Sequence, residues 1–317
     1  MLAGIFSALA AGLLWGLVFL VPLLLPEYPA PLLSVGRYLA FGIIALPLAF
    51  FDRHGLLKLS RADWLEALKL SAIGNLLYFL CLASAIQRAG APLPTVMIGT
   101  LPVVIAITAN LRGGGRDGKL PWKRLAPSLC AIVAGIACVN RAEWNALTHS
   151  SDADLTRYLS GALFALGAIA CWTWYPLRNA DWLRHHPDRS PRAWATAQGL
   201  ATLPLAAAGY LLVWAVLGFS GNSFALPFGP RPELFIGLMI ALGLCASWLG
   251  TLCWNEASQR LRTAVAGQLI VFETLAALAY AFILRGEWPQ PLTLFGIVLL
   301  IAGVLWAVRI KPEPLSD

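Results

Sequence analysis

The chain has 317 residues, of which 59% are hydrophobic and only 12% are charged, and its mean hydropathy is +0.71. A water-soluble domain carries about twice that charged fraction, so the composition excludes an ordinary soluble enzyme or binding domain. The net charge of +7 would suggest nucleic acid as the partner of a soluble protein, but here the basic residues lie in loops between apolar segments, and no nucleic-acid partner is expected.

Ten apolar segments fill most of the chain, and each is about long enough to cross a bilayer as a helix of ~20 residues. In chain order they are Leu2–Leu24, Pro31–Phe51, Asp63–Ile86, Pro92–Leu111, Arg124–Val139, Tyr158–Leu177, Arg192–Leu217, Glu233–Ala257, Thr263–Leu284 and Pro291–Val308. We therefore expect an all-α membrane protein with ten transmembrane helices and no soluble catalytic domain. The first segment lacks a preceding basic region, so we expect a span there and no cleavable signal.

The loop charges predict the orientation of these segments. With a cytoplasmic N-terminus, sixteen Lys and Arg residues fall in inner loops and five in outer loops. Because inner loops carry the excess of basic residues, this bias predicts a multi-pass protein with both termini in the cytoplasm, and we expect it in the bacterial inner membrane.

No cofactor or metal is expected from the Cys and His residues. All six cysteines lie inside apolar segments, where they serve as small packing residues, and all four histidines lie in loops. A metal carrier would need ligands that converge within the membrane, and the sequence offers no such group.

The second five segments echo the first five. A shift of 157 residues aligns spans one and two with spans six and seven, a shift of 172 aligns the third with the eighth, and a shift of 168 aligns the fifth with the tenth. The matched residues include Gly4 with Gly161, Trp15 with Trp172, Gly42 with Gly199, Leu46–Ala49 with Leu203–Ala206, Gln87-Arg88 with Gln259-Arg260, and Ala134-Gly135 with Ala302-Gly303. An odd number of spans per repeat inverts the second copy, an arrangement typical of secondary transporters. We expect a first five-helix repeat at 1–141, an outer linker at 142–157, the inverted repeat at 158–309 and a short cytoplasmic tail at 310–317.

Several short motifs resemble those of one transporter superfamily. They are Gly12-Leu-Leu-Trp15-Gly16, Arg37-Tyr38, Gly74-Asn75 through Tyr78, Gly99-Thr-Leu-Pro102-Val103, Phe272-Glu273, Gly286-Glu287 and Gly296 to Gly303. The whole chain is similar to the drug/metabolite transporter (DMT) superfamily, specifically to its EamA-type ten-helix members, with the YddG-like amino-acid exporters as the nearest comparison. The resemblance implies two five-helix halves that surround a central cavity, with spans five and ten at the periphery.

The two halves also differ. Leu101 stands in the first half where the second has Glu273, and Gly113-Gly114-Gly115-Arg116 replaces the Gly-Glu that follows the ninth span. No strand precedes this glycine run and no Lys-Ser/Thr follows it, so it is a flexible link and not a phosphate loop. These departures argue against a symmetric two-acid mechanism.

Two charged residues within the spans are candidates for the transport site. Glu273 lies near the middle of the ninth span, where an ionisable group is costly, so it is a candidate to couple transport to protons or to receive a substrate ammonium. The alternative is a structural carboxyl. Arg37 could bind a substrate carboxylate through two parallel hydrogen bonds. The alternatives are that it extends to the membrane interface or pairs with a loop acid such as Glu27.

Polar and aromatic residues in matching spans complete the predicted site. Asn75 and Tyr78 share one helical face with Ser71, and Trp248, Thr251 and Asn255 share another in the eighth span. The predicted substrate-binding residues are Trp15, Arg37, Tyr38, Asn75, Tyr78, Trp172, Tyr175, Trp248, Thr251, Asn255 and Gln268. Pro47, Pro102 and Pro204 are candidate hinges, because an internal proline removes a helical hydrogen bond.

These observations predict a secondary transporter that works by alternating access and exports small metabolites such as aromatic amino acids, with the bilayer and protons as its other partners. Alternatives are a carrier of sugars, nucleotides or drug-like compounds, and an integral membrane enzyme, for which no catalytic spacing is present. The sequence leaves the substrate, the coupling ion, the direction and the oligomeric state open.

Overall fold

The structure is a computed structural model that describes residues 2–111, 121–148, 155–219, 224–261, 263–286 and 288–310, all of them in helices or the turns between helices. The helices are α1 (Leu2–Gly16), α2 (Val21–Leu24), α3 (Ala30–Leu56), α4 (Arg61–Leu70), α5 (Tyr78–Ala89), α6 (Pro92–Ile98), α7 (Leu101–Leu111), α8 (Trp122–Thr148), α9 (Leu155–His185), α10 (Pro191–Phe219), α11 (Pro232–Ala241), α12 (Gly250–Arg260), α13 (Thr263–Leu269), α14 (Val271–Arg285) and α15 (Pro291–Val308).

Within the described residues, eight helical runs are long and apolar enough to cross a membrane. They are Leu2–Leu24, Ala30–Leu56, Arg61–Ala89, Trp122–Val139, Leu155–His185, Pro191–Phe219, Pro232–Arg260 and Val265–Arg285. The all-helical membrane architecture is thus confirmed, and these runs correspond to eight of the ten expected segments. The expected fourth segment consists of the two short helices α6 and α7, and the tenth is α15, whose stretch Pro291–Gly303 is a shorter apolar helix.

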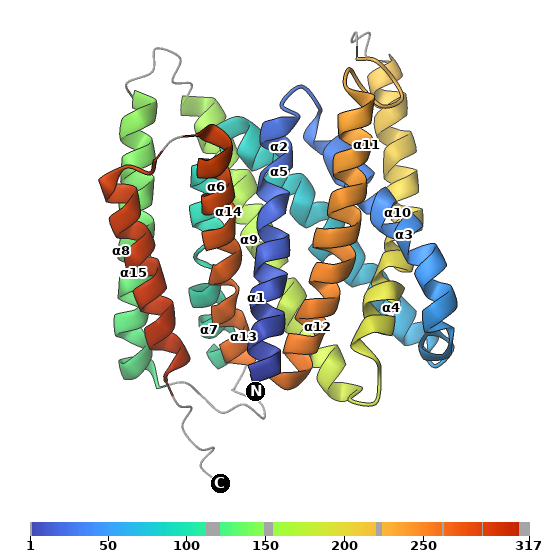
Figure 1. Cartoon of the computed structure of the whole chain (residues 1–317), viewed down its shortest axis with the longest axis horizontal. Coiled ribbons are helices and arrows are strands. Elements are labelled where there is room, and N and C mark those ends of the chain that lie inside the picture. The colour runs from blue at the N-terminus through green and yellow to red at the C-terminus, as the bar shows by residue number, and fades with distance from the viewer. Residues whose placement is uncertain are drawn as a thin grey trace.

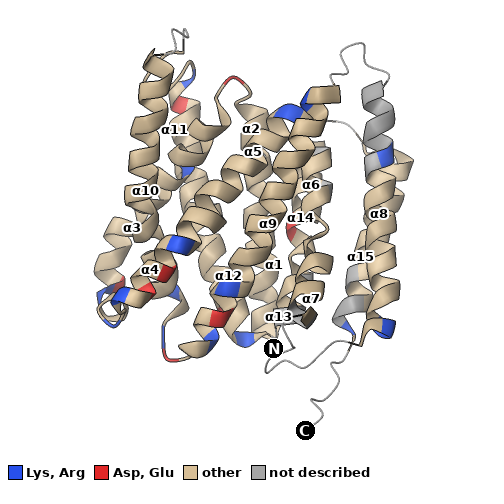
Figure 2. Ribbon diagram, turned by 180° about the vertical axis from the view of Figure 1, so that it is seen from behind, with Lys and Arg blue, Asp and Glu red and all other residues tan. Residues whose placement is uncertain are grey.

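The helices run side by side as one bundle, and α1 begins at the same end at which α15 ends (Figure 1). We call this end the terminal face and the other end the opposite face. Charged residues gather at the two ends, with few between them (Figure 2). Large apolar side chains such as Phe6, Phe50 and Ile283 are two-thirds or more exposed, as expected for a surface that faces lipid.

Helices of the two halves pack against each other in reciprocal pairs. At the crossing of α3 and α10, a Cβ added to Gly42 would lie 2.6 Å from Cβ of Leu203, and one added to Gly199 would lie 2.7 Å from Cβ of Ala45. Gly42 and Gly199 are equivalent residues of the sequence repeat, so each fills the same role toward the other half. Only glycine permits such a close approach of two helices at these positions.

A second reciprocal pair joins α8 and α15, which lie together at one edge of the bundle (Figure 1). A Cβ added to Gly135 would lie 2.6 Å from the carbonyl oxygen of Gly296 and 3.0 Å from Leu300, and one added to Gly303 would lie 2.7 Å from Ile132. Gly135 and Gly303 are again equivalent in the repeat. Gly135 and Gly303 therefore allow close contact between α8 and α15, as Gly42 and Gly199 do between α3 and α10.

Four of the long runs depart from regular α-helix near the middle of the bundle. Residues Ser71–Leu77 and Leu242–Leu249 are π-helical. A break at 99–100 separates α6 from α7, and Ile270 separates α13 from α14. Such irregular turns leave backbone carbonyls available to other partners. The hydroxyl of Ser34 donates to the carbonyl of Leu76 over 2.9 Å, and the indole N–H of Trp15 donates to that of Ala246 over 3.0 Å.

The three candidate hinge prolines occupy two kinds of position. Pro47 and Pro204 lie inside α3 and α10, the two helices that cross at Gly42 and Gly199. Pro102 instead lies in the first turn of α7, just after the break at 99–100. A proline in the first turn removes no helical hydrogen bond, so the break and not the proline is the irregular point of that segment.

Candidate functional site

A small cavity lies between the two irregular π-helical stretches, enclosed by residues from α1, α3, α5, α9, α12 and α14. We call it the central cavity. Its lining residues are Trp15, Val18, Arg37, Tyr38, Asn75, Tyr78, Trp172, Ala246, Ser247, Thr251 and Glu273. The volume open to the centre of a water molecule is about 10 Å³, roughly the minimum for one water molecule. The side chains therefore close almost completely on the space between them.

Glu273 is fully buried on one wall of the central cavity. It lies in the first turn of α14, immediately after the break at Ile270, where the positive end of the helix dipole favours an anion. Its Oε1 accepts a hydrogen bond from the hydroxyl of Tyr78 over 3.4 Å, and its Oε2 accepts one from the indole N–H of Trp172 over 3.2 Å. The carboxyl group is thus held by two aromatic donors from α5 and α9.

Arg37 is the cation of the same cavity, with only 4% of its surface exposed. Its Nε donates to the hydroxyl of Ser247 over 3.0 Å. Its guanidinium carbon lies 4.6 Å from the ring centre of Phe79 and 4.8 Å from that of Tyr38. Its Nη1 is buried without a hydrogen-bond partner among the described residues, and a buried unpaired donor costs free energy until it meets an acceptor.

The alternative in which Arg37 pairs with Glu27 is wrong. The carboxylate of Glu27 accepts hydrogen bonds from Arg231, including one of 2.8 Å between Nη2 and Oε2, in a loop at the opposite face. Arg37 lies deeper, on α3 against the π-helical stretch Leu242–Leu249. No loop carboxylate in the described part of the structure contacts it.

Aromatic rings form a continuous stack beside Glu273. The ring of Trp172 lies between those of Tyr78 and Tyr175, with centroid distances of 4.4 Å and 5.1 Å. Trp15 meets Trp172 edge to face at 4.9 Å. Tyr175 is not among the residues that line the cavity, and its hydroxyl donates to the side chain of Gln198 over 2.9 Å. The repeat-equivalent pair Trp15 and Trp172 thus meets at one wall of the cavity.

The remaining predicted site residues divide between the cavity and the helix contacts around it. Asn75 and Thr251 line the cavity, whereas Trp248 and Asn255 do not. The indole N–H of Trp248 donates to the hydroxyl of Thr196 over 3.1 Å, and the amide of Asn255 is bonded to Asn179. The side chain of Gln268 lies outside the described part of the structure.

A chain of buried polar side chains joins α9, α10 and α12 on the terminal side of the cavity. Oδ1 of Asn179 accepts from the indole of Trp194 over 2.9 Å and from the amide of Gln198 over 3.2 Å, while its Nδ2 donates to Asn255 over 2.9 Å. Sequence reasoning missed Asn179 and Gln198. Gln198 carried a signal, because an amide side chain in an apolar segment needs partners inside a membrane. Asn179 carried none, since it lies beyond the expected end of its segment at Leu177, whereas α9 continues to His185.

An ion pair between the halves also lies on the terminal side. Arg178 of α9 donates from its Nη2 to Oε2 of Glu66 on α4 over 3.1 Å, and a second bond joins its Nε to Oε1. Glu66 therefore bonds to a helix of the other half of the chain. Among the residues described, no three His, Cys, Asp or Glu side chains gather as metal ligands would.

A bundle of apolar helices around a closed polar cavity, with irregular turns at the level of that cavity, is the build of a membrane transporter. The chain belongs to the EamA-like transporter family. The sequence pattern that defines this family matches residues 2–141. Membership in this family makes the chain a membrane transporter and not an enzyme, and the resemblance seen in the motifs is confirmed.

Two relatives extend this comparison. The chain is 56% identical over 319 residues to "Inner membrane protein YtfF" of Escherichia coli (strain K12), an alignment that covers all of this chain and 98% of the relative. It is 29% identical over 198 residues to a "Probable terminal-alkyne amino-acid exporter" of Streptantibioticus cattleyicolor, covering 57% of this chain and 60% of that protein. The first relative places this chain in the inner membrane.

A solved crystal structure has the same fold. It superposes on 96% of this chain and on 96% of its own chain with a TM-score of 0.66, at 17% sequence identity. At that identity the likeness concerns the fold alone.

Proposed function

We propose that this transporter exports a small zwitterionic metabolite, with aromatic amino acids as the leading class, by alternating access of the central cavity to the two faces. The observation that carries the proposal is the presence of one buried basic side chain and one buried acidic side chain, Arg37 and Glu273, on the walls of the same cavity. An amino acid carries one charge of each sign, so it can satisfy both walls at once.

Arg37 supplies the carboxylate end of this site. Among the described residues its Nη1 has no hydrogen-bond partner, while its Nε is held by Ser247, so the guanidinium is fixed with one donor left for a ligand. A carboxylate is the acceptor that guanidinium groups bind most strongly. Glu273 supplies the ammonium end. Its carboxylate binds either the substrate ammonium or a proton, and each of them would replace its hydrogen bonds from Tyr78 and Trp172.

The aromatic wall accounts for a flat apolar side chain in the substrate. Trp15, Tyr78 and Trp172 present ring faces and edges next to Glu273. Aromatic rings favour offset-stacked or edge-to-face contacts with one another. A substrate ring in this space would take part in the same stack, which favours aromatic amino acids over sugars.

Alternating access is supported by the symmetry of the irregular segments. The sequence shift of 172 carries Ser71–Leu77 onto 243–249, and the second π-helical stretch spans Leu242–Leu249. The breaks that precede α7 and α14 likewise fall in the fourth and ninth segments, which are equivalent in the predicted ten-span, inverted arrangement. Two halves with matching weak points can exchange conformations, so that a cavity closed in one arrangement opens to a different face in the other.

Export as the direction rests on the name of the Streptantibioticus relative, which is described as an amino-acid exporter, and on the predicted cytoplasmic position of the terminal face. Proton coupling through Glu273 belongs to the same proposal.

The test is counterflow in proteoliposomes with three related compounds: phenylalanine, its amine without the carboxylate, and its acid without the ammonium. The wild-type protein should exchange phenylalanine with saturation and both truncated compounds poorly. Arg37→Gln should lose the preference for phenylalanine over the amine, and Glu273→Gln the preference for phenylalanine over the acid. Arg88→Gln, which removes a positive charge outside the cavity, is the control and should change neither.

Two results would reject the proposal. Saturable exchange of sugars or nucleotides in the absence of any amino-acid exchange would move the substrate to another class. If both variants fold but lose exchange of all three compounds to the same extent, the charged pair has only a structural role.

A further inference from the structure

A second cavity opens between α8 and α15 at the terminal face, apart from the central cavity. Its volume is about 770 Å³, within the ~300–1,000 Å³ of small-molecule sites. We call it the edge cavity. Its lining residues are Lys123, Arg124, Pro127, Ala302, Leu305, Trp306, Arg309 and Ile310.

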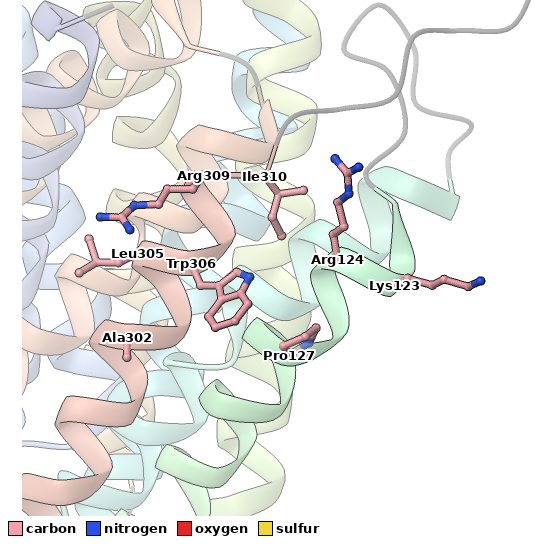
Figure 3. Close-up of a pocket in the computed structure, with 8 residues that line it drawn as sticks. All are labelled: Lys123, Arg124, Pro127, Ala302, Leu305, Trp306, Arg309 and Ile310. Carbon is pink, nitrogen blue, oxygen red and sulfur yellow. The ribbon is translucent and has the colours of Figure 1, made fainter.

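The lining of the edge cavity is basic at its rim and apolar inside. Lys123, Arg124 and Arg309 are exposed, and no acidic residue is among the described residues that line the space. Figure 3 shows the indole of Trp306 projecting from α15 toward Pro127 on α8, whereas the cationic groups fan out around the mouth. Three flexible cations around an apolar pocket are complementary to an anionic headgroup that carries hydrocarbon.

The apolar interior of the edge cavity continues along the outer surface of both helices. Val133 on α8 and Phe295 and Val298 on α15 are 56%, 56% and 60% exposed. The two helices pack mainly on each other through Gly135 and Gly303, and they also contact α6, α13 and α14. The exposed side chains lie on the remaining surface, which is left to the bilayer. An occupant of the cavity thus has a path for acyl chains next to its headgroup site.

We propose that the edge cavity binds an anionic phospholipid, with its phosphate among Lys123, Arg124 and Arg309, its glycerol region against Trp306, and its acyl chains along α8 and α15. Tryptophan is enriched at the level of the headgroups, where its ring is apolar and its N–H is polar. Basic pockets between membrane helices on the cytoplasmic side suit anionic headgroups, and the terminal face is the side on which the loop charges predict the cytoplasm.

Lipid binding to the purified full-length protein tests the proposal without any transport assay, so failure of the proposed function would not affect it. The protein in neutral detergent is titrated with phosphatidylglycerol, cardiolipin or phosphatidylethanolamine of equal chain length, and bound lipid is counted by native mass spectrometry. The variant Lys123→Gln, Arg124→Gln, Arg309→Gln removes the three cations. The matched control, Arg53→Gln, Lys58→Gln, Arg61→Gln, removes three exposed cations near the end of α3 at the same face.

The expected result is selective retention of phosphatidylglycerol or cardiolipin over phosphatidylethanolamine. This retention should weaken about tenfold or more in the edge-cavity variant, since each surface cation contributes to the attraction, and stay within about twofold of wild type in the control. Trp306→Ala keeps all three charges and should weaken retention several-fold by removing the ring.

Four outcomes would overturn the proposal. Equal losses in the two triple variants would indicate only a diffuse positive surface. Equal retention of phosphatidylethanolamine would indicate an apolar groove without headgroup recognition. Binding of inorganic phosphate that prevents the retention of every lipid would indicate a site for a free anion. A dimer mass that persists in the presence of each of the three lipids would assign this face to a second copy of the protein.

Discussion

The indole N–H of Trp172 on α9 donates a hydrogen bond to Oε2 of Glu273 on α14 over 3.2 Å. It links a fully buried carboxyl group to the central ring of the aromatic stack formed with Tyr78 and Tyr175. Any ligand that takes the place of this donor must also disturb the stack. The charge site and the aromatic site are therefore one unit and should respond together to substitution.

Trp172→Phe is expected to lower the melting temperature and raise the KM for exchange, because it removes one of the two donors to Glu273. Leaving a buried acceptor short of a donor costs about 1–3 kcal/mol. Trp254→Phe is the matched control, since it loses the same volume near Trp15 while its own buried Nε1 has no partner among the described residues. Thermal unfolding and counterflow of both variants check the prediction, and equal effects would show that only ring volume matters.

Most of the residues that line the central cavity were predicted from the sequence, but Val18, Ala246 and Ser247 were not. Glu273 and Arg37 stand out because a charge within an apolar segment is costly and rare, and Trp172 stands out because the repeat pairs it with Trp15. Ser247, which holds Arg37, has no such signal. A serine is common in packed membrane helices, and only the fold places it opposite a guanidinium group.

The π-helical stretches were missed because the sequence argument assumed a period of 3.6 residues. On a regular helix Ser71, Asn75 and Tyr78 would share one face. In the structure the wider turns separate them: Ser71 donates to the carbonyl of Gln198, whereas Tyr78 reaches Glu273. The segments and their pairing could thus be read from hydropathy and the repeat, but the rotation of side chains within them could not.

Gly42→Ala and Gly199→Ala should each destabilise the protein, because an added methyl group would meet the facing helix at 2.6 Å and 2.7 Å. Overpacking of this kind costs about 1–3 kcal/mol. The two substitutions should destabilise the protein by similar amounts, since the residues are equivalent across α3 and α10. Thermal unfolding in detergent measures the effect.

Gly237→Ala provides the control for this pair. Gly237 lies in α11 and has open space around it, so alanine there should be neutral or stabilising through its higher helix propensity. A destabilisation by Gly237→Ala as large as that at the crossing would contradict the packing argument.

The ion pair of Glu27 and Arg231 should give the opposite face a pH dependence. The hydrogen bond from Arg231 lowers the pKa of Glu27 below its usual value of 4.5. A depressed pKa means that the stabilisation is present above about pH 4.5 and is lost as the pH falls through the lower folded-state pKa. The effect should be small, because both side chains are partly exposed and screened by solvent.

Glu27→Gln should therefore lower the melting temperature slightly at pH 7, and this difference should shrink as the pH falls below 4.5. Glu256→Gln, which removes a carboxylate paired within one helix with Arg260, serves as the comparison for the loss of one charge. A difference between wild type and Glu27→Gln that grows toward acid would mean that the sign of the argument is reversed.

The bond between Glu66 on α4 and Arg178 on α9 should hold the terminal side closed, because it ties one half of the protein to the other. Glu66→Arg and Arg178→Glu should each reduce thermal stability and the maximal rate of exchange, since both place like charges together. The double swap should restore much of both, with a coupling energy of roughly 0.5–3 kcal/mol for residues in direct contact. The same swap at Glu256 and Arg260, within α12, should leave exchange unchanged. If the double swap at Glu66 and Arg178 were no better than the worse single variant, the pair would have no role in closing this side.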